Sequence, residues 1–185
     1  MSFTRKKYSL IFLVITGLGL WPADGFGQWS KINLRSDSAI VSDVILDVFF
    51  INSDTGFLAT DQGVLYKTVN GGYNWSFDTL AAGGSIGPIF FVTDQVGYIK
   101  AASPTYFYGE ILKTTDGGVN WTNPAPDFTA GASEAIYFFN PDIGMIGGAS
   151  AVSTTFDGGV NWSTNYNVGS GEIHDIRFMG GNYLD

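Results

Sequence analysis

The sequence predicts an all-β fold: a β-propeller of four-stranded antiparallel blades, incomplete at about three blades plus the first strand of a fourth. Three observations predict it. One pattern recurs at a spacing of roughly 40 to 50 residues, which is typical of propeller blades. Glycine is nearly twice as frequent as usual, with 25 in 185 residues against about 13 expected. After residue 28 no sustained helical periodicity occurs.

The first 27 residues have the pattern of a secretory signal peptide. The basic stretch Arg5–Lys7 precedes an apolar run, Leu10–Leu20, of 11 residues. A membrane span needs roughly 20 apolar residues, so we expect cleavage, after either Gly25 or Gly27, and no stable membrane insertion afterwards. The mature chain, residues 28–185, is then expected outside the cytoplasm: in the periplasm, at the cell surface or secreted.

Three landmarks define the repeat. In each unit a Phe ends the first strand, a Gly begins the second, and a Trp follows a Gly-Gly turn. The Phe and Gly series are both separated by 41 and 47 residues, and the Trp series by 46 and 41. The landmarks are Phe50, Phe91 and Phe138; Gly56, Gly97 and Gly144; and Trp75, Trp121 and Trp162. The blades are expected at about 39–80, 81–130 and 131–168, with the next beginning at 169–185.

Each unit is expected to contain four short strands. The stretches Val64–Thr68 and Ile111–Thr115 are rich in β-forming residues, and each leads into Asn/Asp-Gly-Gly, a strong hairpin signal. A segment at Gln28–Ser38 is expected to help close the propeller. Because three blades and a part should not close alone, either the chain is truncated or several copies associate through their open ends.

The repeated turn, Thr-x-Asp/Asn-Gly-Gly-x-Asn-Trp, spans residues 68–75, 114–121 and 155–162; we call these segments the Trp turns. The Asp or Asn side chain can accept hydrogen bonds from backbone N–H groups of its own turn. The glycines allow positive φ, and the Trp ring packs against neighbouring strands. The residues expected to hold the turns are Asn70, Gly72, Trp75, Asp116, Gly118, Trp121, Asp157, Gly159 and Trp162.

These turns resemble the Asp-box, or BNR, repeat, whose pattern is Ser/Thr-x-Asp-x-Gly-x-Thr-Trp. The first turn departs from it at Asn70, and Asn replaces the Thr in all three turns. The stretch Gly56–Thr68 also resembles the secreted propellers related to photosystem II assembly and stability factors. Similar repeats occur in sialidases, in sortilin-type receptors and in exported proteins of gliding bacteria. The resemblance implies a propeller over residues 28–185, in which the Asp-box is structural.

Composition excludes several kinds of site. A net charge of -8 argues against a nucleic-acid partner, since phosphate contacts need Lys and Arg. The absence of Cys excludes disulfides and thiolate zinc sites. The turns Asn52–Gly56, Thr93–Gly97 and Asn140–Gly144 each carry one acid, whereas calcium needs six to eight oxygens. We therefore expect structural Asx-type turns, no metal and no cofactor, and interpret His174 as a packed or edge residue.

Catalysis is not expected. The resemblance to sialidases implies a site with three arginines that clamp a carboxylate, a Tyr/Glu nucleophile pair and an acid/base Asp. After the signal only Arg35 and Arg177 remain, so this chain cannot supply that clamp alone. The alternative is a sialidase-like glycoside hydrolase, or a lyase, whose active site is completed by blades missing from this chain.

A binding site is expected on the loop between the second and third strands of the second unit. Separations from landmark Gly to Trp are 19, 24 and 18, so this unit carries about five extra residues, within Ser103–Glu110. The insertion contains Tyr106, Phe107, Tyr108 and Glu110, and lies on the face opposite the Trp turns. Loops on rigid scaffolds often bind, although these aromatics could instead fold back over the blade edge. The sequence thus predicts an exported, non-catalytic scaffold for protein or glycan binding.

Overall fold

The computed structural model describes residues 43–81, 83–102, 109–126, 128 and 133–177, and these form ten β-strands. Within these ranges there is no helix, and hence none that could cross a membrane. The all-β prediction is therefore confirmed. The predicted signal peptide and the predicted closing segment at 28–38 lie outside the described residues.

The first sheet has the predicted four-stranded order. Strands β1 (Ile45–Phe50), β2 (Gly56–Thr60), β3 (Val64–Thr68) and β4 (Ser76–Thr79) are consecutive and antiparallel. Strands β2 and β3 are almost entirely buried, whereas all four residues of β4 are exposed. The hydrophobic residues are thus concentrated in the middle strands, and β4 forms an edge.

The second sheet consists of β5 (Ile86–Phe91), β6 (Gly97–Ala102) and β7 (Gly109–Thr114), again consecutive and antiparallel. Among the described residues of this unit, its expected fourth strand is reduced to one bridge, at Thr122, which pairs with a residue of β7. Pro124 lies two residues further on and has no backbone N–H to donate to a sheet. The outer strand therefore stops almost where it begins.

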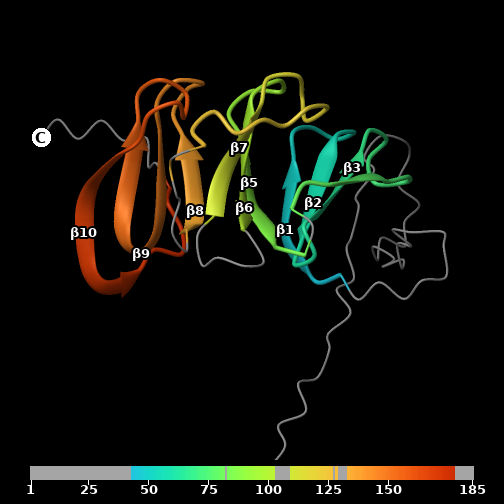
Figure 1. Cartoon of the computed structure of the whole chain (residues 1–185). Helices are drawn as coiled ribbons and strands as arrows, with labels where there is room; N and C mark the ends of the chain where they lie inside the picture. The colour runs from blue at the N-terminus through green and yellow to red at the C-terminus, as the bar shows by residue number, and fades with distance from the viewer. Residues whose placement is uncertain (1–42, 82, 103–108, 127, 129–132, 178–185) are drawn as a thin grey trace, which may run out of the picture.

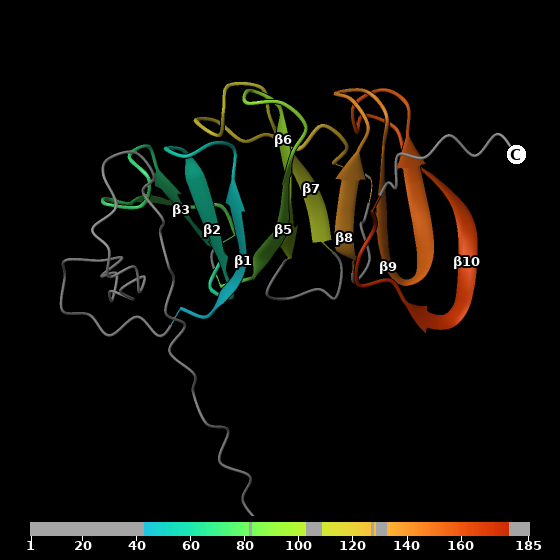
Figure 2. The ribbon, with the colours of Figure 1, turned by 180° about the vertical axis from the view of Figure 1, so that it is seen from behind.

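The third sheet departs from the expected four strands. It contains β8 (Ser133–Phe138), β9 (Gly144–Thr155) and β10 (Ser163–Glu172), in the order β10-β9-β8. The first part of β9 pairs with β8, and its last part pairs with β10. The two middle strands expected in this unit are thus one continuous strand of 12 residues. Figures 1 and 2 show that β9 and β10 both bend at the lower edge of the sheet.

The three sheets stand side by side as part of a β-propeller (Figures 1 and 2). Strand β1 packs against β5, and β5 packs against β8, so the first strands of successive sheets are neighbours. The loops joining the first strand to the second, and the Trp turns, gather at the upper edge in Figure 1. We call this edge the turn end and the opposite edge the far end.

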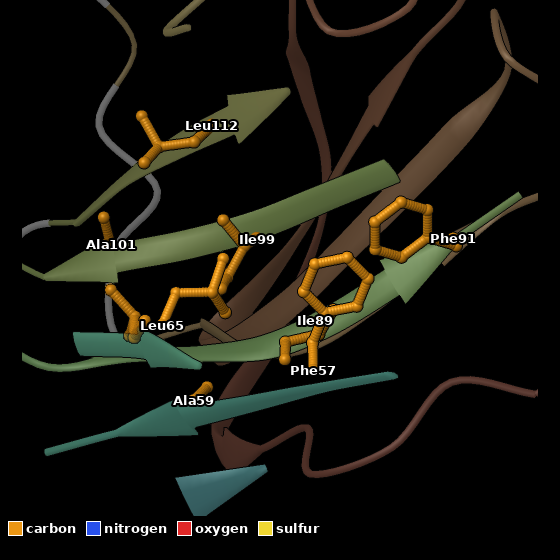
Figure 3. Close-up of a cluster of buried hydrophobic side chains, with 9 residues drawn as sticks. Phe57, Ala59, Leu65, Ile89, Phe91, Ile99, Ala101 and Leu112 are labelled. Atoms are coloured by element: carbon orange, nitrogen blue, oxygen red, sulfur yellow. The ribbon is translucent and has the colours of Figure 1, made fainter. Parts of the chain in front are cut away.

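Hydrophobic clusters fill both spaces between the sheets. Because side chains alternate along a strand, Phe57 and Ala59 of β2 face the second sheet (Figure 3), where Phe57 stacks on Phe91 with ring centroids 4.9 Å apart. On β6, Ile99 belongs to this same cluster, whereas Tyr98 belongs to the cluster shared with the third sheet. The middle sheet is therefore covered on both faces.

The Phe and Gly landmarks of the repeat are direct cross-strand partners. Phe50 pairs with Gly56, and the equivalent pairs are Phe91 with Gly97 and Phe138 with Gly144. A Cβ placed on any of these three glycines would lie 2.4 to 2.6 Å from the nearest ring carbon of its partner. The spacing between the Phe and the Gly is the same in every unit because each ring lies directly over its glycine.

Candidate functional site at the two ends of the sheets

The Trp turns are closed by a network centred on Thr and Asp. In the second turn the Thr114 hydroxyl donates to Asp116 Oδ1 at 2.8 Å and accepts the backbone N–H of Gly118 at 2.9 Å. Asp116 also accepts the backbone N–H of Asn120 at 2.9 Å and its side-chain N–H at 2.7 Å. The same contacts recur in the third turn around Asp157.

These hydrogen bonds keep the turn carboxylates charged. The backbone N–H of Asn120, followed by its side chain and the Thr114 hydroxyl, holds the pKa of Asp116 well below its usual value. The pKa of Asp157 is lowered chiefly by the backbone N–H and then the side chain of Asn161. A carboxylate with a lowered pKa is a poor general acid near neutral pH, so the two groups are suited to holding the turns.

The first turn forms the equivalent hydrogen bonds of the Thr hydroxyl and of the Asx oxygen to the backbone with an uncharged side chain. Thr68 donates to Asn70 Oδ1 at 3.0 Å, and this oxygen accepts the backbone N–H of Asn74 at 2.9 Å. Gly72 donates its N–H to the Thr68 hydroxyl at 2.8 Å. An amide oxygen therefore replaces the carboxylate as acceptor, and the turn forms without the charge.

The three Trp residues pack alike but bond differently. The indole N–H groups of Trp75 and Trp162 donate at 3.0 Å to the carbonyls of Gly72 and Gly159 respectively. The buried indole N–H of Trp121 has no hydrogen-bond partner among the described residues. All three Trp side chains are partly buried at the turn end. Their role is therefore to pack against the strands.

A lysine on each of the first two sheets joins that sheet to the Trp turn of the next sheet. Lys67 Nζ of β3 donates to the carbonyl of Gly117 at 2.8 Å, and Lys113 Nζ of β7 donates to that of Gly158 at 3.0 Å. Burial lowers the pKa of Lys67, against the opposing effect of the nearby Asp116 carboxylate. Each ammonium group also lies over an aromatic ring, at 5.5 and 5.4 Å from the centroid.

Tyr98 reinforces the second of these junctions. Its hydroxyl donates to the carbonyl of Pro141 at 2.8 Å and lies 3.3 Å from that of Gly158, and its ring stacks on Phe138 at 3.6 Å. Burial, together with the charge of Asp142, raises the pKa of this phenol. The hydroxyl therefore stays protonated as a structural donor and is unsuited to act as a nucleophile.

Sequence reasoning missed one partly buried carboxylate, Asp47 on β1. Its two oxygens accept the backbone N–H of Val48 at 2.8 Å and of Ile89, on the neighbouring sheet, at 2.7 Å. Burial raises its pKa, against the opposing effect of these two hydrogen bonds. The available signal was an acid inside an otherwise apolar strand, and the equivalent positions Pro88 and Ala135 carry no acid.

The loops between first and second strands are closed by their leading residue. Asn52 Oδ1 accepts the backbone N–H groups of Asp54 and Thr55, and Asn140 closes its loop in the same way. Thr93 does so in the second unit through its hydroxyl. The expected Asx-type turns therefore use Asn or Thr, and the single acid of each loop is exposed. Across the described ranges, no cluster of three or more metal-ligating side chains occurs.

The far end is only partly described. Tyr106, Phe107 and Tyr108 of the expected binding loop lie outside the described residues. Glu110, at the start of β7, is exposed, and its carboxylate accepts the side-chain N–H of Asn123 at 2.6 Å. Further along the chain, the exposed His174 lies 3.5 Å from the Glu172 carboxylate.

Known proteins share this organisation. Over residues 22–185 the sequence matches the family described as photosynthesis system II assembly factor YCF48. The chain belongs to this family. The resemblance to photosystem II assembly factors and the BNR-type propeller are thereby confirmed.

A curated relative in the YCF48 family is the photosystem II assembly lipoprotein Ycf48 of Synechococcus sp. (strain CC9902), 27% identical over 91% of this chain and 51% of the relative. A solved structure titled YCF48 bound to D1 peptide is 26% identical, with a TM-score of 0.57, and covers 69% of this chain and 43% of its own. YCF48 from Cyanidioschyzon merolae, 23% identical with a TM-score of 0.54, shares the fold over 66% of this chain and 39% of its own. The chain thus spans about half the length of the curated relative.

Proposed function

We propose that this chain is part of a non-catalytic assembly scaffold that binds a peptide segment of another protein outside the cytoplasm. Membership of the YCF48 family carries this proposal. One solved member of the family is titled as bound to a D1 peptide, and the Synechococcus relative is named an assembly lipoprotein. The partner proposed here is therefore a D1-type peptide. The proposed location is outside the cytoplasm, because the relative is named a lipoprotein.

The chemistry of the described residues supports a non-catalytic role. The Asp116 and Asp157 carboxylates are engaged by their own turns, and the Tyr98 hydroxyl is held by carbonyl groups. Asp47 is occupied by two backbone N–H groups. The titratable groups with the most altered pKa values thus have structural partners, whereas catalytic groups need to face a substrate.

The proposed contact surface is the far end around the loop that carries Tyr106, Phe107, Tyr108 and Glu110. Glu110 supports it because its exposed carboxylate, at the start of β7, is positioned by Asn123. Aromatic side chains supply large contact areas for a peptide. A glycan is the alternative ligand at the same loop, and the experiment below includes it.

Fluorescence anisotropy with a labelled D1 peptide tests the proposal. We expect saturable binding by the full chain, weakened about tenfold or more in Tyr106→Ser/Tyr108→Ser, with an unchanged melting temperature. Phe77→Ser is the control, because Phe77 is an exposed aromatic residue on β4. Absence of peptide binding, or binding of an oligosaccharide in its place, would contradict the peptide proposal. Equal weakening by Phe77→Ser would contradict the choice of surface.

A further inference from the structure

The Trp turns present apolar side chains to solvent at two equivalent positions. These are the positions marked x in the pattern Thr-x-Asp/Asn-Gly-Gly-x-Asn-Trp. Of the six, one is a Thr, and the other five are large apolar or aromatic residues that are 52% to 73% exposed. The five are Val69, Tyr73, Val119, Phe156 and Val160. Single exposed hydrophobics are ordinary, but recurrence at equivalent positions of three successive units forms an ordered row.

The fold holds this row in place without using it. The side chains that close each turn by hydrogen bonds are those of the Thr and of the Asp or Asn, and the x residues take part only through their backbone, as where the Val119 N–H donates to Asp116 Oδ1 at 3.0 Å. Each turn is also tied to the preceding loop of its own unit, as in the 2.8 Å bond from Gly71 N–H to the Asp54 carbonyl. Lys67 of β3 and Lys113 of β7 each join their own sheet to the Trp turn of the next. A partner would therefore meet turns whose backbone is already ordered, and little free energy would be lost in ordering that backbone.

The charge around the row is negative. Three exposed carboxylates stand on the loops between first and second strands, Asp54, Asp94 and Asp142, and two more belong to the turns. Against these five acids the described residues of the turn end offer two lysines, whose half-buried ammonium groups already donate to glycine carbonyls. The complementary partner is apolar and positively charged.

We propose that the turn end is a second docking surface, which binds a protein segment that combines apolar side chains with Lys or Arg. We call this surface the turn face and define it by the five apolar residues above with Asp54, Asp94 and Asp142. The inference goes beyond the proposed function, since the turn face is at the opposite end of the sheets from Ala102 and Gly109, the described residues that flank the predicted binding loop. Apolar contacts supply the affinity and carboxylates select the charge of the partner.

The test uses the full chain and three short synthetic peptides, in which serine alternates with leucine and lysine, with leucine and glutamate, or with lysine alone. The variant Tyr73→Ser/Val119→Ser/Phe156→Ser removes one apolar side chain from each turn. The control is Leu46→Ser, because Leu46 is 52% exposed at the far-end start of β1. Melting temperatures are compared in parallel, and Phe156→Arg provides a single, charge-based second variant.

We expect the leucine–lysine peptide to bind the wild type, more weakly at high salt, and the other two peptides to bind at least about tenfold more weakly. The triple variant and Phe156→Arg should both lose affinity for it, whereas Leu46→Ser should retain it. Equal binding of all three peptides would overturn the proposal. So would unchanged affinity in Phe156→Arg, or the same loss in Leu46→Ser. D1 peptide binding is a separate measurement, and either result can fail without the other.

Discussion

The ammonium group of Lys67 lies 2.8 Å from the carbonyl oxygen of Gly117, which is 50 residues further along the chain. Lys113 makes the equivalent contact with Gly158, 45 residues further on. Both contacts cross from one sheet to the next. The backbone N–H and C=O groups of the strands are already hydrogen-bonded within each sheet. These lysine side chains are therefore among the few polar links that fix how adjacent sheets pack together.

Lys67→Met should lower the stability of the chain by about 1 kcal/mol, since a hydrogen bond from a charged donor is lost at a half-buried position. That loss corresponds to a fall in melting temperature of about 2 to 4 °C for a chain of this size. Lys113→Met should have a similar effect, because it removes the equivalent contact. Thermal unfolding followed by circular dichroism measures both; two unchanged melting temperatures would show that the links contribute nothing.

Replacing the Gly of a Phe–Gly pair by Ala should lower stability more where the Phe ring is more deeply buried. Gly144→Ala places a methyl group against Phe138, which is 2% exposed, and overpacking of this kind costs about 1 to 3 kcal/mol. Gly56→Ala should cost less, because Phe50 is 39% exposed and its ring can move. Urea unfolding of the two variants gives the comparison. An equal or larger loss in Gly56→Ala would argue against ring crowding as the cause.

Acid should act on the second and third Trp turns but not on the first. The lowered pKa values of Asp116 and Asp157 mean that their stabilising contribution is present above the ordinary value of 3.8 and is lost as the pH falls through the folded-state values. Asp116→Asn/Asp157→Asn should remove this loss, because Asn70 already closes the first turn. Urea unfolding at pH 7 and pH 3 measures the difference. A double variant that is as acid-sensitive as the wild type would contradict this assignment.

The contribution of Asp47 to stability should depend on pH in the opposite direction. Its pKa is raised above the ordinary value of 3.8, so ionisation disfavours the folded state, and stability is lost as the pH rises through the folded-state value. Asp47→Asn should abolish this dependence and cost about 1 to 3 kcal/mol, because an amide cannot accept both backbone N–H groups. Asp78→Asn, on the exposed β4, is the matched control. Titration of the Asp47 carboxyl by NMR provides the direct check.

The periodic features of the sequence predicted most of the fold. The Phe and Gly landmarks located the first hairpin of every unit because they are cross-strand partners. The Trp turns were recognisable because the hydrogen bonds of their Thr and Asp or Asn side chains are local, spanning at most four residues. Structural features that occur in one unit only were harder to predict from the sequence. Nothing in the repeat indicated that β9 would be continuous or that the outer strand at Thr122 would be a single bridge.

The contacts between units were not predicted. Lys67 and Lys113 stand at equivalent positions, but their acceptors lie on another sheet and are neighbours only after folding. Asp47 has no counterpart in the other units, so the repeat gave no signal for it. The predicted binding loop at residues 103–110 remains a prediction, whereas the exposed row on the Trp turns became visible only once burial was known.

The direction of the lysine contacts has a consequence for synthesis. In both cases the donor lies on the earlier unit and the acceptor on the later one. A nascent chain that has just completed its first sheet cannot yet secure it, because the Gly117 carbonyl has still to leave the ribosome. Because the chain is made from its N-terminus, each of the first two sheets can gain its lysine link only after the following Trp turn is available.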